Sequence, residues 1–184
     1  WDATNLKIML PGALAGMALA WLTASYVSDD TIRIIVGLVG VAFVANMWLQ
    51  RKAEAPTRGH LASGVFWGGV SGFTSFMMQG GGPPFQVYVL PQRLPKLTLV
   101  GTTTIFFAVI NALKIGPYLA LGQFTTANFT TSLLLLPIAA AANLAGVWLV
   151  RKTPTGLFYQ IAYVLLFIIS AALLWQGARG LMHG

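Results

Sequence analysis

Long apolar runs separated by short polar segments follow one another along the whole chain. When the runs are read together with their glycine and proline breakers, they predict apolar helices over residues 6–27, 31–49, 97–115, 130–150 and 158–174. Runs of this length suit the roughly 20 helical residues that cross a hydrocarbon layer of about 30 Å. The pattern therefore predicts five full membrane spans.

A sixth apolar element is interrupted. Residues 61–78 are apolar and rich in glycine and serine, but they end at the segment Gln-Gly-Gly-Gly-Pro-Pro at 79–84, and a short apolar arm follows at 85–90. The glycines and prolines break helical continuity, and irregular backbone at membrane depth is tolerated only where it faces protein or water. We predict a broken or re-entrant helix here.

Composition excludes a soluble domain, because 57% of the 184 residues are hydrophobic, 8% are charged and the mean hydropathy is +0.74. Barrel strands would show short alternating segments, which are missing, so the predicted fold class is an all-α polytopic membrane protein. The formal charge of +7 does not indicate nucleic-acid binding, since the eleven Lys and Arg residues are scattered between apolar runs. Such a pattern is typical of topology anchors.

An internal repeat relates Leu10-Pro11 to Leu136-Pro137, 126 residues later. Each pair opens an apolar helix, and a second helix ends near a tryptophan, Trp48 or Trp175, which lies 37 or 38 residues past the proline. We therefore divide the chain into the remainder of a first repeat (1–50), a basic loop (51–60) and a complete second repeat (61–184). By this offset the first glycine-rich break would precede Trp1, so the chain is expected to begin inside a longer protein.

The distribution of positive charge favours a re-entrant topology. Lys114 lies at a helix end and is counted separately from the other ten basic residues. If the broken element crossed the membrane, these ten would divide five against five, with no preferred orientation. If it returns to the same face, eight lie on one face, against Arg33 and Arg179 on the other. The eight are Lys7, Arg51, Lys52, Arg58, Arg93, Lys96, Arg151 and Lys152. Inverted repeats with broken helices are typical of secondary transporters.

The glycine break is the first candidate binding site. Backbone N–H groups at Gly80, Gly81 and Gly82 can form a positive concavity that suits an anion. Pro83 follows this run, and Gln79 and Gln86 flank it with amide donors. The alternative is a glycine hinge that allows close packing or a kink.

The next apolar helix carries the second group of candidates, which are Thr102, Thr103, Thr104, Asn111 and Lys114. Thr104 and Asn111 are seven residues apart, close to two helical turns, so they can share a face. Lys114 could offset the charge of an anion, or it could snorkel at the helix end. Packing by small residues is the alternative for the threonines.

The sequence predicts no catalytic residue, metal site or cofactor. All four acidic residues fall at the terminus or in polar segments, so the apolar runs hold no carboxylate that could relay protons or bind sodium. The chain has no cysteine, and its two histidines, His60 and His183, are isolated. We therefore do not expect an enzyme.

An ordered set of motifs resembles the second half of the TauE/SafE family of sulfite exporters, also called the sulfonate uptake permease group. These motifs are the glycine-rich segment 64–76, Gly80-Gly81-Gly82-Pro83-Pro84, Gly101-Thr102-Thr103, Asn111-Ala112-Leu113-Lys114 and the segment 117–122. The resemblance implies a permease of the bacterial inner membrane with two inverted repeats. It also implies that the glycine break and the Gly101 to Thr103 helix flank the substrate.

The expected function is a multi-pass permease that moves a small anion, such as sulfite, sulfoacetate or another sulfonate, across the bacterial inner membrane, with export as the expected direction. The expected partners are the anionic substrate and the lipid bilayer, a homodimer is left open, and nucleic acid is excluded. The alternative is a non-transporting helical scaffold or assembly subunit.

Overall fold

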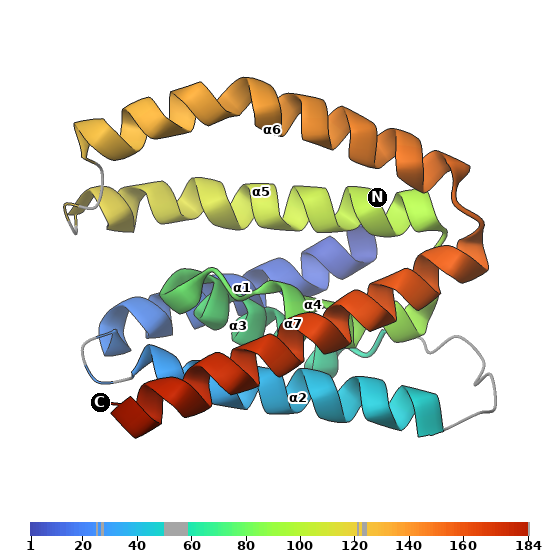
Figure 1. Ribbon diagram of the computed structural model, residues 1–184, viewed down its shortest axis with the longest axis horizontal. Coiled ribbons are helices and arrows are strands. Elements are labelled where there is room, and N and C mark those ends of the chain that lie inside the picture. Colours follow the sequence, from blue (N-terminus) through green and yellow to red (C-terminus); the bar gives the residue numbers. More distant parts are fainter. Residues whose placement is uncertain (25, 27, 50–58, 121, 123–124, 184) are drawn as a thin grey trace.

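The computed structural model describes residues 1–183 except 25, 27, 50–58, 121 and 123–124. In this part of the chain, seven α-helices and one short 3-10 helix are present, and there is no strand. They are α1 (Ala3–Thr23), α2 (Asp29–Leu49), α3 (Leu61–Met78), α4 (Gly82–Val89), η1 (Leu90–Gln92), α5 (Lys96–Ala120), α6 (Thr126–Lys152) and α7 (Thr155–His183). The predicted all-α fold class is confirmed (Figure 1).

Among the described residues, five helices are long and apolar enough to cross a membrane, namely α1, α2, α5, α6 and α7. They are the five spans that the apolar runs predict. Their bounds differ from the predicted ones by a few residues, and the largest extensions are at the C-terminal ends of α5, which continues through Pro117 to Ala120, and of α7, which reaches His183. Proline removes one helical hydrogen bond, but in lipid the remaining backbone groups must still be paired, so the helix continues.

The α3–α4 element is a helical hairpin. From its turn, α4 and η1 lead back toward the end of the molecule where α3 begins. The Tyr88 hydroxyl of α4 lies 3.5 Å from the carbonyl of His60, the residue before α3. At the end of η1, Gln92 Nε2 donates to Asn5 Oδ1 near the start of α1 at 3.2 Å. The two ends of the element thus lie on one side, as the charge distribution predicts.

Helices α1 and α3 run parallel and touch through glycines. A Cβ added at Gly12 would collide with the Val65 carbonyl, and one added at Gly68 or Gly72 would collide with the backbone of α1 at Met9 or Ala13. Small residues allow this approach of two backbones, which is a common packing mode in membranes. The contact fixes the hairpin against α1.

The helices that the predicted sequence repeat pairs with one another run in opposite directions. In Figure 1, α1 runs from right to left and α6 from left to right, and α2 and α7 are likewise opposed. Helices α2 and α7 pack antiparallel, with Gly37 against Leu174 and Gly40 against Ser170. This is the arrangement that an inverted repeat requires.

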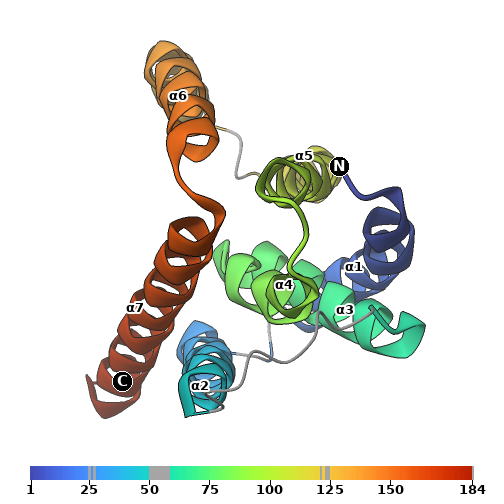
Figure 2. The same cartoon turned by 90° about the vertical axis from the view of Figure 1, so that its right-hand side faces the viewer.

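Helix α6 stands apart from the other helices (Figure 2). None of its apolar window is buried inside the protein. Its connection to α7 is held by Lys96, whose Nζ donates to the carbonyls of Arg151 at 3.0 Å and Thr153 at 2.5 Å. The exposed apolar side chains of α6 are suited to contact with lipid or with other apolar helices.

The basic residues gather at one end of the molecule. Lys7, Arg93, Lys96, Arg151 and Lys152 belong to helix ends and turns on the side where α1, α3 and α5 begin. Arg33 and Arg179 lie at the other end, where Gly177 and Gly180 of α7 approach Asp30 of α2. The residues Arg51, Lys52 and Arg58 lie outside the described part of the chain.

Candidate substrate site

The turn between α3 and α4 is held by groups of α3 itself. Gln79 ends α3 in the left-handed conformation, with φ of 58°, and its N–H and that of Gly80 both reach the Thr74 carbonyl. Ser71 Oγ donates to the Gly81 carbonyl at 2.7 Å. The break is therefore a fixed turn, and one of the three predicted glycine N–H groups, that of Gly80, is already used.

Lys114 of α5 is buried against this turn, with 3% of its surface exposed. Its Nζ donates to Ser75 O and Ser75 Oγ at 2.7 Å each, and to Gln79 Oε1 at 2.9 Å. The side chain thus reaches the last turn of α3, where unpaired carbonyls and the helix dipole favour a cation. The snorkelling alternative is therefore wrong, because the ammonium is held inside the protein.

Tyr118 completes this cluster from the next turn of α5. Its hydroxyl donates to the Phe76 carbonyl at 3.0 Å and accepts from Gln79 Nε2 at 3.0 Å. Gln79 therefore bridges the ammonium of Lys114 and the hydroxyl of Tyr118. We call Ser75, Gln79, Lys114 and Tyr118 the lysine cluster.

The glycine turn lies directly beside the lysine cluster. A Cβ added at Gly81 would come within 2.7 Å of both the Ser71 carbonyl and Ser75 Cβ. Ser75 is thus in contact with Gly81 on one side and with Lys114 on the other. Gly82, the first residue of α4, has open space where a Cβ would stand. The N-terminus of α4 and the buried ammonium therefore border the same small region.

A small cavity of about 180 Å³ lies nearer the basic end of the molecule. Its polar lining comes from Gln86 of α4 and from Thr103 and Thr104 of α5. Both threonine hydroxyls donate to carbonyls four residues earlier, whereas Gln86 Oε1 is buried without a partner among the described residues. The amide of Gln86 thus has hydrogen-bonding capacity left.

The cavity and the lysine cluster lie along the same side of α5. Thr103 and Lys114 are eleven residues apart, which is about three helical turns and about 16 Å. Between them, the ring of Phe107 packs against Phe85 and Phe106, with centroid distances of 5.5 and 5.2 Å. One side of α5 therefore carries two polar positions separated by an aromatic cluster.

A family model for the sulfite exporters TauE/SafE matches residues 1–173, nearly the whole chain. The chain belongs to the TauE/SafE sulfite exporter family. No curated protein and no solved structure shows a significant match. Membership, together with the five apolar helices, makes this a multi-pass membrane protein of a family of anion transporters and not of enzymes.

Of the other predicted site residues of this TauE/SafE protein, two are buried and two are exposed. Thr102 is fully buried, and its hydroxyl donates to the Thr98 carbonyl and accepts from the Asp2 N–H at 2.8 Å, so it joins α1 to α5. Pro83 is buried in the first turn of α4. Asn111 and Thr104 are both exposed, as expected for two residues on one face.

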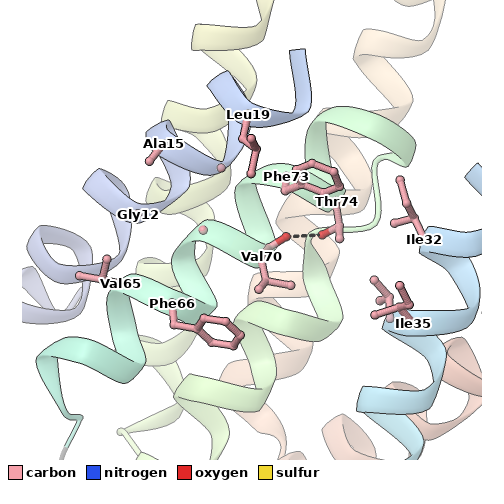
Figure 3. A pocket seen from close by; sticks show the side chains of 13 residues that line it. Gly12, Ala15, Leu19, Ile32, Ile35, Val65, Phe66, Val70, Phe73 and Thr74 are labelled. Atoms are coloured by element: carbon pink, nitrogen blue, oxygen red, sulfur yellow. Dashed lines mark hydrogen bonds between the residues drawn. The ribbon is translucent and has the colours of Figure 1, made fainter. Parts of the chain in front are cut away.

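A larger cavity of about 560 Å³, lined by α1, α2 and α3, does not have the chemistry of an anion site (Figure 3). Its lining is apolar except for Thr74, whose hydroxyl donates to the Val70 carbonyl at 2.8 Å. No charged residue is among the described residues that line it. An anion would lose its hydration there without gaining a partner.

Ser75 and Tyr118 take part in the lysine cluster but were not predicted from the sequence. A single serine in an apolar helix usually bonds its own helix, and a tyrosine near a helix end usually marks the membrane interface. The available signal was spacing, because Tyr118 lies four residues after Lys114 and so shares its face.

Proposed function

We propose that this protein is a permease for sulfite or a related sulfonate in the bacterial cytoplasmic membrane, and that the substrate binds beside the lysine cluster. The observation that supports the proposal most directly is the burial of Lys114 among neutral partners. Its three acceptors are a carbonyl, a hydroxyl and an amide oxygen. Among the described residues, no carboxylate contacts this ammonium.

A buried charge of this kind is costly in a membrane, and such residues usually mark a pathway. An anion that reaches the turn gains the attraction of this charge in a medium of low dielectric constant. Gln79 is exposed at the turn and holds one of the three ammonium protons. Its amide oxygen is the partner that an arriving anion can replace without disturbing Ser75.

The small cavity of about 180 Å³ beside α5 is proposed as a second substrate position on the same route. Gln86, Thr103 and Thr104 supply polar groups there, and the cavity lies nearer the end of α5 that carries Lys96. A substrate moving along α5 would pass the ring of Phe107 between the two positions. Asn111 lies on the same side of this helix between Phe107 and Lys114.

Export from the cytoplasm is the proposed direction, in keeping with the description of the family as sulfite exporters. The inner membrane is proposed because positively charged residues gather at one end of the molecule, which is then the cytoplasmic end. The family match favours this function over a non-transporting scaffold.

Sulfite flux through proteoliposomes that contain the full-length protein tests the proposal. Lys114→Met removes the buried charge and replaces lysine with an unbranched side chain of similar length. Lys7→Met is the control, because it makes the same change at an exposed position near the start of α1. We expect saturable flux in the parent and in Lys7→Met, and a loss of at least about tenfold in Lys114→Met. Equal flux in all three would contradict the assigned site, and no flux of any sulfur oxyanion would favour the scaffold.

A further inference from the structure

We propose that Tyr118 is a positioning residue that holds the side chain of Gln79 across the ammonium of Lys114. In this arrangement Gln79 closes the substrate site, and a substrate anion must displace it to reach Lys114. The inference rests on the proposed function and adds to it how the site opens. It applies to any sulfur anion that the site accepts, because it concerns contacts between the protein's own groups.

The hydrogen bonds of Tyr118 fix the orientation of the Gln79 carboxamide. The hydroxyl of Tyr118 has one hydrogen, and it donates this hydrogen to the Phe76 carbonyl at 3.0 Å. Toward Gln79 Nε2, also 3.0 Å away, the hydroxyl can then only accept. The carboxamide nitrogen of Gln79 must therefore face Tyr118, and its oxygen is left to face Lys114.

Lys114 requires the same orientation from the other side. An ammonium has three hydrogens and no lone pair, so it can bond only to the oxygen of a carboxamide. That oxygen lies 2.9 Å from Lys114 Nζ, and the other two bonds of the ammonium go to Ser75 at 2.7 Å each. A reversed carboxamide would lose the bonds to both Tyr118 and Lys114. The side-chain amide of Gln79 is therefore held at both of its ends.

Gln79 also lies on the open side of Lys114. Its side chain is exposed among the described residues, whereas Ser75 and Lys114 are buried. The backbone of Gln79 is fixed by its left-handed conformation and by its N–H, which reaches the Thr74 carbonyl. The side-chain torsions remain free to move. Rotation of this side chain is therefore the smallest change that opens the ammonium to an anion.

The hydroxyl of Tyr118 adds to the cost of that rotation. When the carboxamide turns away, it loses the bond to Lys114, which an arriving anion replaces, and the bond to Tyr118, which the anion does not replace. A neutral hydrogen bond of this kind changes an equilibrium constant by about two- to tenfold. Because the substrate binds only the open arrangement, its apparent affinity is reduced by the same factor.

Tyr118→Phe tests this inference in the full-length protein in proteoliposomes. The substitution removes the hydroxyl and keeps the ring, which packs against Phe76 with a centroid distance of 5.5 Å. We expect the KM of sulfite flux to fall about two- to tenfold, while the maximal flux stays within about twofold of the parent. A purely structural role of Tyr118, or a bond from its hydroxyl to the substrate, predicts the opposite change, which is a raised KM.

Gln79→Ala tests the other half of the inference, because it removes the group that closes the site. The KM of this variant should be at least as low as that of Tyr118→Phe, and adding Tyr118→Phe to it should change the KM no further. Such a double-mutant cycle isolates the coupling between the two side chains. The control is Tyr88→Phe, which removes a hydroxyl 3.5 Å from the His60 carbonyl, at the other end of the hairpin, and should keep the KM of the parent.

A KM in Tyr118→Phe that equals or exceeds that of the parent would overturn the inference and leave the permease function in place. An effect of Tyr118→Phe that is equal with and without Gln79 would do the same. If Tyr118→Phe does not yield folded protein, the KM of Gln79→Ala decides, because a value above that of the parent shows that Gln79 does not close the site. Absence of sulfite and sulfonate flux in the parent would overturn the proposed function, and the inference with it.

Discussion

At the scale of single residues, the decisive feature is an ammonium group whose partners are all neutral. The three donors of Lys114 Nζ are paired, because Ser75 supplies a carbonyl and a hydroxyl and Gln79 supplies an amide oxygen. Removal of one acceptor leaves a buried donor unpaired, which costs about 1–3 kcal/mol or more for a charged group. The same residues thus stabilise the turn and keep a positive charge available to a substrate.

Gln79→Glu should abolish anion transport while the protein stays folded. The carboxylate would stand where Gln79 Oε1 now lies, 2.9 Å from Lys114 Nζ, and would neutralise the ammonium. We expect sulfite flux in proteoliposomes to fall at least about tenfold, whereas the melting temperature in detergent should stay equal or rise because the buried charge gains a partner. The control is Gln176→Glu, which adds the same negative charge at an exposed position of α7. Undiminished flux in Gln79→Glu would remove Lys114 from the pathway.

The sequence predicts part of this site, and the limit is physical. Gln79, the glycines and Lys114 are recognisable because glycine runs and buried lysines are costly in a membrane and thus stand out. Lys114 meets the residues at the end of α3 only because α5 packs beside α3, since Ser75 and Lys114 are 39 residues apart in the sequence. No local pattern contains that pairing. For the same reason the burial of Thr102 against Asp2 was not foreseen.

At the scale of elements, the contact of α1 with α3 fixes the position of the hairpin. The apolar pattern gives the bounds of α3 correctly because its end is marked by glycine and proline. It gives the end of α5 too early, because Gly116 and Pro117 end helices in water but not in lipid, where backbone pairing takes precedence. The end of α7 is also predicted too early. The sequence shows that α1 and α3 are rich in glycine, but it does not show which backbone atoms these glycines approach in the other helix.

Gly72→Val should destabilise the protein by disrupting the α1–α3 contact. Its Cβ would collide with the Ala13 carbonyl of α1, and backbone cannot yield as a flexible side chain does. We expect a melting temperature in detergent about 5–10 °C lower, from a cost of about 1–3 kcal/mol or more. Gly146→Val in α6 is the matched control, because nothing lies within 4 Å of a Cβ there. Equal melting temperatures would show that the two helices do not touch at this point.

At the scale of the whole molecule, opposite repeats and a returning hairpin together set which loops share a face. The count of basic residues predicts this arrangement from the sequence, because an even division between the faces would give no orientation. The structure agrees, since Gln92 meets Asn5 and Tyr88 meets His60 at one end. Which end faces the cytoplasm then follows from the positive charges alone.

Single cysteines test that arrangement cleanly, because the chain contains none of its own. We expect His60→Cys, Arg93→Cys and Lys152→Cys to react with an impermeant thiol reagent from the cytoplasmic side, and Thr125→Cys to react from the outside. Labelling in right-side-out and inside-out vesicles measures this. Arg93 decides the topology, because a hairpin that crossed the membrane would place it opposite His60. If Arg93→Cys labels from the side opposite His60→Cys, and Thr125→Cys from the same side as His60→Cys, the re-entrant hairpin is wrong. If all four sides are exchanged, the fold stands and only the orientation is reversed.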